Sequence, residues 1–151
     1  MYRFEKILGT GNFGTARIAS KIINPNVKFA IKSIPRAKIE QDMDLFEQEL
    51  GILLSVDHPN IVKFFEAFLD HKYVHLVMEL CHGGELFTRL QEIKLFREED
   101  ARIIIKQSLQ AIKHLHDLNI AHRDLKPENI LFVEKGNTIK LIDFGMSKIC
   151  R

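Results

Sequence analysis

The most constraining feature of the sequence is a polar stretch of eight residues, His122–Asn129, with the order HRDLKPEN. Pro127 rules out a continuous helix here, because proline lacks an N–H donor and its ring clashes with the preceding turn. The stretch therefore reads as a loop held by the apolar residues on both sides. A hydroxyl group can be brought near Asp124, Lys126 can hold a phosphate oxygen, and Asn129 can be one of the ligands of a metal ion. For eight residues alone, a solvated charged loop remains the alternative.

A second motif, Asp143-Phe144-Gly145, follows closely in the sequence. Residues 138–142 read as a strand, so the acid stands at a strand end where a backbone turn can aim it. Gly145 permits such a turn, because glycine adopts backbone conformations that other residues avoid. A lone Asp-Phe-Gly is common by chance, but its position shortly after the polar loop favours a shared function.

Composition sets limits on the class of protein. The 151 residues are 46% hydrophobic and 28% charged, which is typical of one soluble globular domain. The formal charge of +2, from 22 basic and 20 acidic residues, is too balanced to indicate nucleic acid as the main partner. Two cysteines, Cys81 and Cys150, do not make a disulfide framework. With no signal peptide and no membrane-spanning segment in view, we expect an intracellular, cytoplasmic protein.

The N-terminal part carries glycines in the pattern G-x-G-x-x-G at residues 9–14. Residues 2–34 alternate in polarity and predict three antiparallel strands, with a turn at residues 24–26. A dinucleotide-binding turn would need a helix directly after the glycines. A strand at residues 15–19 follows instead, so we expect a hairpin whose backbone N–H groups can approach phosphates closely. An ordinary glycine-rich hairpin is the alternative.

A lysine and a glutamate form a second candidate pair. Lys32 lies in the predicted third strand, where a buried ammonium group needs an anionic partner. Residues 40–55 predict a helix in which Glu49 stands in line with Leu45 and Leu53, on the apolar side. Glu49 is therefore the expected partner of Lys32. The alternative is a surface glutamate on a frayed helix.

The middle of the chain predicts two further strands, at residues 61–68 and 73–79. Gly83 and Gly84 then break the second strand and indicate a flexible connection between two lobes. Residues 85–91 predict the start of a short helix.

A long helix is expected from Arg97 to Asp117. Acidic residues in its first turn suit the helix dipole. The expected apolar stripe consists of Ala101, Ile105, Ser108, Ile112 and Leu115. The run Ile103-Ile104-Ile105 is apolar around most of the circumference, so we expect burial on nearly all sides of this helix.

Together these motifs resemble those of a eukaryotic-type protein kinase, and the resemblance spans the whole chain. It implies an α+β fold with a five-stranded antiparallel N-lobe sheet and one main helix, followed by the first, mostly helical part of the C-lobe. The expected boundaries are 1–80 for the N-lobe and 81–151 for the hinge and partial C-lobe.

The resemblance also implies ATP and Mg²⁺ as cofactors and a role for each motif residue. Asp124 accepts the proton of the substrate hydroxyl, Lys126 contacts the γ-phosphate, and Lys32 contacts the α- and β-phosphates while pairing with Glu49. The implied Mg²⁺ ligands are Asn129 and Asp143. The implied cofactor-binding residues are Leu8, Gly9, Gly11, Gly14, Ala16, Ala30, Lys32, Met78, Glu79, Cys81, Glu85 and Leu131. Within this set Ala16 stands where the family usually has valine.

Finer features point to a subgroup. The lysine after the catalytic aspartate, Lys126, resembles the pattern of serine/threonine kinases. Residues 76–87 and 143–148 resemble the calmodulin-kinase group, most of all calcium-dependent protein kinases. No calcium-binding loop pattern occurs, so a calcium response would need regions outside this chain. The alternative is a non-catalytic ATP-binding or interaction module, such as a truncated pseudokinase.

Two expectations concern substrates and the C-terminal end. By the same resemblance, Glu85 and Glu128 face basic residues upstream of the phosphorylated serine or threonine of protein substrates. The chain stops at Arg151, six residues after Gly145. The family's activation segment and later helices are therefore expected to be missing, and we expect the chain alone to be inactive and to fold poorly.

Overall fold

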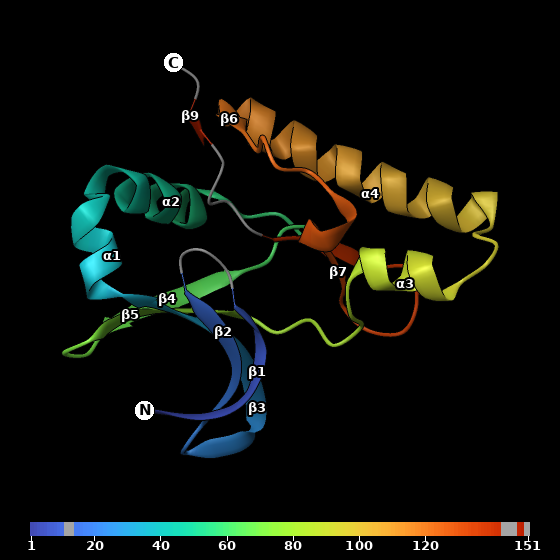
Figure 1. Cartoon of the computed structure of the whole chain (residues 1–151). Helices are drawn as coiled ribbons and strands as arrows, with labels where there is room; N and C mark the ends of the chain where they lie inside the picture. Colours follow the sequence, from blue (N-terminus) through green and yellow to red (C-terminus); the bar gives the residue numbers. More distant parts are fainter. Residues whose placement is uncertain (11–13, 143–147, 150–151) are drawn as a thin grey trace. The chain divides into compact units, whose positions relative to one another are not determined.

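The computed structural model describes residues 1–10, 14–142 and 148–149 (Figure 1). The chain divides into two compact units. The first combines Met1–Glu47 with Lys63–Leu80, and the second combines Gln48–Val62 with the chain from Cys81 onward.

The first unit is built on a five-stranded antiparallel sheet with the strand order β1-β2-β3-β5-β4. Its strands are β1 (Tyr2–Thr10), β2 (Thr15–Lys21), β3 (Asn24–Pro35), β4 (Phe64–Leu69) and β5 (Tyr73–Glu79). The predicted five-stranded antiparallel sheet is therefore confirmed. The predicted turn at residues 24–26 is wrong, because Lys21 pairs directly with Asn24 and the chain turns at residues 22–23.

One hydrophobic cluster of the first unit lies on one face of this sheet. It contains Phe29 and Ile31 of β3 together with Ala19 and Val77. Because side chains alternate along a strand, Lys32 stands on the opposite face of β3 from Ile31. The candidate site position Lys32 and this cluster therefore lie on opposite faces of the sheet.

The predicted helix at residues 40–55 is two helices, α1 (Arg36–Gln41) and α2 (Met43–Ser55). Asp42 separates them, with a backbone φ of −144° that no α-helix contains. Its carboxylate Oδ1 accepts a hydrogen bond from Leu45 N at 3.4 Å, as an N-cap residue does. The aspartate side chain therefore starts a new helix where periodicity alone predicted continuity.

The second unit combines helices with short strands. Its helices are the part of α2 from Gln48 onward, α3 (Leu86–Glu92), α4 (Glu98–Asp117) and the 3₁₀ turn η1 (Pro127–Asn129). Its strands are β6 (Ile120–Ala121), β7 (Ile130–Phe132), β8 (Ile139–Leu141) and β9 (Lys148–Ile149). β7 pairs with β8, and β6 pairs with β9, in both cases antiparallel. The predicted strand at residues 61–68 begins only at Phe64, because Ile61 forms a parallel bridge with Leu141 instead.

Burial of α4 differs from the prediction. Its buried residues are Ile104, Ser108, Ala111 and Leu115. Ile103 and Ile105 remain 42% and 59% exposed, because consecutive helical residues point about 100° apart and only the middle isoleucine faces the core. The expected burial on nearly all sides is therefore wrong, and Ile105 does not belong to the buried stripe. No helix among the described residues has the length and apolar character needed to cross a bilayer.

Candidate active site

The polar loop brings three of the predicted site residues together. Asn129 is only 5% exposed, and its Nδ2 donates to the Asp124 backbone oxygen at 2.9 Å and to Asp124 Oδ2 at 3.1 Å. Lys126 Nζ lies 3.4 Å from Asp124 Oδ1. Pro127 occupies the first position of η1, where its missing N–H has no helical partner to lose. The loop thus presents an acid, a cation and an amide within one turn of chain.

His122 holds the loop in place through hydrogen bonds at both nitrogens of its ring. The ring is 6% exposed, its Nδ1 accepts a hydrogen bond from Asp124 N at 3.2 Å, and its Nε2 donates to the Ile142 backbone oxygen at 3.3 Å. Arg123, between them, has a φ of 64°, which lies in the left-handed region that L residues rarely adopt. The backbone conformation at Arg123 is therefore held by its surroundings, and it sets the direction of Asp124.

The loop is also joined to the end of β8. Ile142 N donates to the Asn129 backbone oxygen at 2.9 Å, so both backbone groups of Ile142 bind the loop. Ile142 directly precedes Asp143, which lies outside the described residues, as does Gly11. Sequence reasoning missed Ile142, because its contribution comes from backbone groups that no side-chain pattern reveals.

The side-chain oxygen of Asn129 is suited to bind a cation. Its side-chain nitrogen is engaged by Asp124, and among the described residues its Oδ1 makes no hydrogen bond, so that oxygen is the group left to bind a metal. Carboxylate and amide oxygens are ligands that Mg²⁺ prefers. Within the described residues, no group of three or more His, Cys, Asp or Glu side chains is placed to hold a metal by itself.

Residues 82–85 pair with β7 and place two more predicted residues side by side. Glu85 forms an antiparallel bridge with Leu131, and the Gly83 N–H donates to the Phe132 oxygen at 2.9 Å. A Cβ on Gly83 would stand 2.5 Å from Phe132 Cβ, closer than real Cβ contacts occur, so only glycine permits this approach. Cys81 is half-buried just before this segment.

In the first unit, the predicted cofactor residues form cross-strand rows. Gly9 pairs with Ala16, and Ala16 pairs with Lys32. Ala30 pairs with Met78 on the neighbouring strand. Directly paired residues face the same side of a sheet, and Ala30 and Lys32 are two positions apart on β3, so both rows share one face.

The remaining residues of the first unit stand at its glycine-rich turn and at the end of β5. A Cβ on Gly14 would lie 2.2 Å from the Ser33 backbone oxygen, so this glycine allows β2 to approach β3. Leu8 is 47% exposed on β1. Glu79 exchanges hydrogen bonds with Lys63, its N–H donating to the Lys63 oxygen at 2.9 Å and its Oε2 accepting from Lys63 N at 3.1 Å.

Glu49 faces inward on α2, as predicted, with 7% of its surface exposed. Lys32 is half-buried on β3. The two residues belong to different units, and their pairing stays a prediction.

Comparison with known proteins identifies the family. The protein kinase domain matches residues 2–151, and the chain therefore belongs to the protein kinase domain family. Calcium/calmodulin-dependent protein kinase type 1 of Macrobrachium nipponense is 39% identical over 150 residues, which cover 98% of this chain and 44% of the relative. Calcium-dependent protein kinase 6 of Plasmodium berghei is 40% identical over 147 residues, which cover 97% of this chain and 10% of the relative.

These similarities confirm the predicted serine/threonine kinase family of the calmodulin-kinase group. Relatives named for calmodulin dependence and for calcium dependence match at nearly equal identity. The chain spans less than half the length of these relatives.

Proposed function

We propose that this chain supplies the nucleotide-binding and catalytic-loop part of an enzyme that transfers the γ-phosphoryl group of ATP to serine or threonine hydroxyls of proteins. The observation that carries the proposal is the joint placement of Asp124, Lys126 and Asn129 in a loop fixed by His122. Phosphoryl transfer needs little covalent chemistry from the protein. It needs positioning and charge neutralisation, which these groups can provide.

Each loop residue has a separate task in this reaction. The Asp124 carboxylate accepts the proton of the attacking hydroxyl, and the Asn129 amide holds that carboxylate in place through its Nδ2. Lys126 balances charge on the phosphoryl oxygens. Mg²⁺, when bound by Asn129 and Asp143, would neutralise the phosphate charge that develops during transfer.

The glycine-rich segment and β3 would hold the phosphates of the nucleotide. Gly9, Gly11 and Gly14 would let backbone N–H groups approach the phosphates, and Lys32 would bind the α- and β-phosphates with Glu49 as its partner. The adenine would contact a set of residues from β1 to β7, namely Leu8, Ala16, Ala30, Met78, Glu79, Cys81 and Leu131. Residues 1–80 and 81–151 would act as the two lobes of the enzyme.

Protein substrates with basic residues before the acceptor suit the second unit. Glu85 is exposed at the start of α3, Glu128 lies in η1, and α3 packs against η1. Two acids on contacting elements can bind an arginine about three positions before the acceptor. We propose an intracellular location for such a reaction, where ATP and Mg²⁺ are plentiful.

Binding and turnover test the proposal separately. The 151-residue chain should bind a fluorescent ATP analogue more tightly with Mg²⁺ than with EDTA. Lys32→Met should weaken that binding, and Lys28→Met serves as the control, because Lys28 lies on the same strand and pairs with Glu5 at the surface. Equal binding by the wild type and Lys32→Met would refute the assignment of Lys32.

Turnover would be measured in a longer chain, because these 151 residues span less than half the length of the relatives. The sequence would be joined to the remaining part of the kinase domain of a calmodulin-dependent relative and assayed with radiolabelled ATP and a basic peptide. Asp124→Asn and Asp143→Asn should each lower the rate by about 10²-fold or more, and Asp124→Asn should leave ATP binding intact. Nucleotide binding without any turnover in the unsubstituted chimera would favour a non-catalytic module.

A further inference from the structure

We propose that Gln107 of α4 is a positioning residue for the catalytic loop, and that it acts by fixing the register of β8. The inference rests on the proposed function for the roles of Asp124 and Asn129. Gln107 belongs to no motif and lies outside the apolar stripe expected for its helix, yet its amide contacts the first residue of β8, the strand that leads to Ile142.

The Gln107 amide uses all of its hydrogen-bonding capacity. Its Oε1 accepts from Asn60 Nδ2 at 2.9 Å and from Ile139 N at 3.1 Å. Its Nε2 donates to the Asn137 oxygen at 2.6 Å and to the Ile103 oxygen at 3.1 Å. A side-chain amide offers two donors and two favoured acceptor positions, and every one of them is filled here. Such a group cannot move without breaking several bonds at once.

β8 is held on both sides at the point that Gln107 contacts. Asn60 Nδ2 also donates to the Ile139 oxygen at 2.9 Å, and Leu141 N donates to the Asn60 oxygen at 2.8 Å. β7 occupies the other edge of β8. A slip of one residue would turn every side chain of β8 to the opposite face, so the bonds at Ile139 decide which residue follows the strand into the site.

The register of β8 is transmitted to the loop by Ile142. The Ile142 N–H binds the Asn129 oxygen, the Ile142 oxygen accepts from His122, and Asn129 in turn binds Asp124. Gln107 is therefore connected to the two residues proposed to hold metal and accept the proton by hydrogen bonds at Ile139 and Ile142 and by the chain between them. If β8 loses its register, the loop loses the backbone partner that orders Asn129.

Hydrogen exchange separates positioning from ordinary stabilisation. Gln107→Met keeps the length of the side chain and removes all four bonds, whereas Gln107→Glu keeps the accepting oxygen and loses the donors. Gln110→Met is the matched control, because the Gln110 side chain is exposed on the same helix and makes no hydrogen bond with the described residues. Exchange would be followed by mass spectrometry on the 151-residue chain, in peptides covering 124–132, 138–142 and the strands of the first unit.

We expect Gln107→Met to speed exchange about tenfold in both peptides of the second unit, a factor that corresponds to about one net hydrogen bond. Gln107→Glu should give a smaller increase, and Gln110→Met should give none. Faster exchange in all peptides alike would mean that Gln107 only stabilises the fold. Faster exchange in 138–142 with 124–132 unchanged would mean that β8 does not transmit its position to the loop. Either result would overturn the proposal.

Metal dependence provides the second readout. With a fluorescent ATP analogue, Gln107→Met should raise the Mg²⁺ concentration needed for half-maximal binding by about three- to tenfold, and leave affinity in EDTA unchanged. An unchanged Mg²⁺ requirement, in a wild type that responds to Mg²⁺, would contradict the proposal. If the wild type shows no response to Mg²⁺, the proposed function is wrong, and the exchange result still decides the role of Gln107.

Discussion

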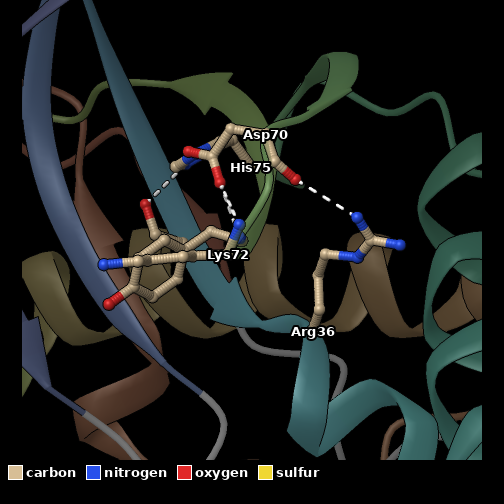
Figure 2. Close-up of polar contacts among 6 residues, drawn as sticks. Arg36, Asp70, Lys72 and His75 are labelled. Carbon is tan, nitrogen blue, oxygen red and sulfur yellow. Dashed lines mark hydrogen bonds and ion pairs between the residues drawn. The ribbon is translucent and has the colours of Figure 1, made fainter.

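Replacing the buried His75 with phenylalanine should lower the stability of the first unit, because it removes the partner of a buried hydroxyl group. Ser33 and His75 are both 4% exposed, and Ser33 Oγ lies 2.8 Å from His75 Nδ1. His75 Nε2 in turn lies 2.8 Å from Asp70 Oδ2 (Figure 2). The histidine therefore joins β3 to the turn between β4 and β5.

The size of the effect follows from what phenylalanine keeps and loses. The His75 ring stacks on Phe68 with centroids 4.6 Å apart and planes inclined by 26°, and a phenylalanine ring can preserve that contact. The loss is then confined to polar groups. An unsatisfied buried hydroxyl costs about 1–3 kcal/mol. In a protein of this length each kcal/mol lowers the melting temperature by about 2–4 °C.

A second substitution tests whether the Ser33 hydroxyl causes the loss of stability. Ser33→Ala in the His75→Phe background removes the stranded hydroxyl, and replacing both partners by apolar groups can be nearly neutral. The double variant should therefore melt at a higher temperature than His75→Phe alone. The assay is urea or thermal unfolding followed by circular dichroism.

His71→Phe, in the exposed part of the same hairpin, is the control and should change stability by less than about 0.5 kcal/mol. A double variant no more stable than the single one would show that the Ser33 hydroxyl was not the cause.

Two further predictions follow from charge and exposure. The hydrogen bond from His75, with two from the Lys72 and Tyr73 N–H groups, holds the pKa of Asp70 well below its ordinary value of 3.8. The contribution of ionised Asp70 to stability is therefore present above pH 3.8 and is lost as the pH falls from there towards the lowered pKa. Asp70→Asn should flatten the acid limb of a stability–pH curve below about pH 4, and an unchanged limb would contradict this. On α4, Ile105 and Leu109 are each 59% exposed, so Ile105→Gln with Leu109→Gln should reduce self-association in light scattering, and equal association would refute a role for this face.

Much of the fold could be predicted because local patterns and tertiary structure agree. Alternating polarity located the first three strands, and helical spacing correctly predicted that Glu49 faces inward. The helix break at Asp42 could not be predicted from periodicity, because a capping carboxylate competes with the apolar pattern. On α4, periodicity predicted that Ile105 lies on the buried face of the helix. In the structure Ile104 lies on that face instead.

In the candidate site too, some residues could be predicted from the sequence and others could not. The motif residues Asp124, Lys126 and Asn129 could be named from the sequence because their side chains carry the chemistry. The residues that aim them could not. Ile142 acts through its backbone, and Gln107 acts through bonds to residues 47 and 32 positions away in the chain. A half-buried amide such as that of Gln107 has no periodic signature, and its partners are revealed only once the neighbouring strand is placed. Positioning groups of this kind are therefore found by following hydrogen bonds outward from the motif rather than by extending the motif along the sequence.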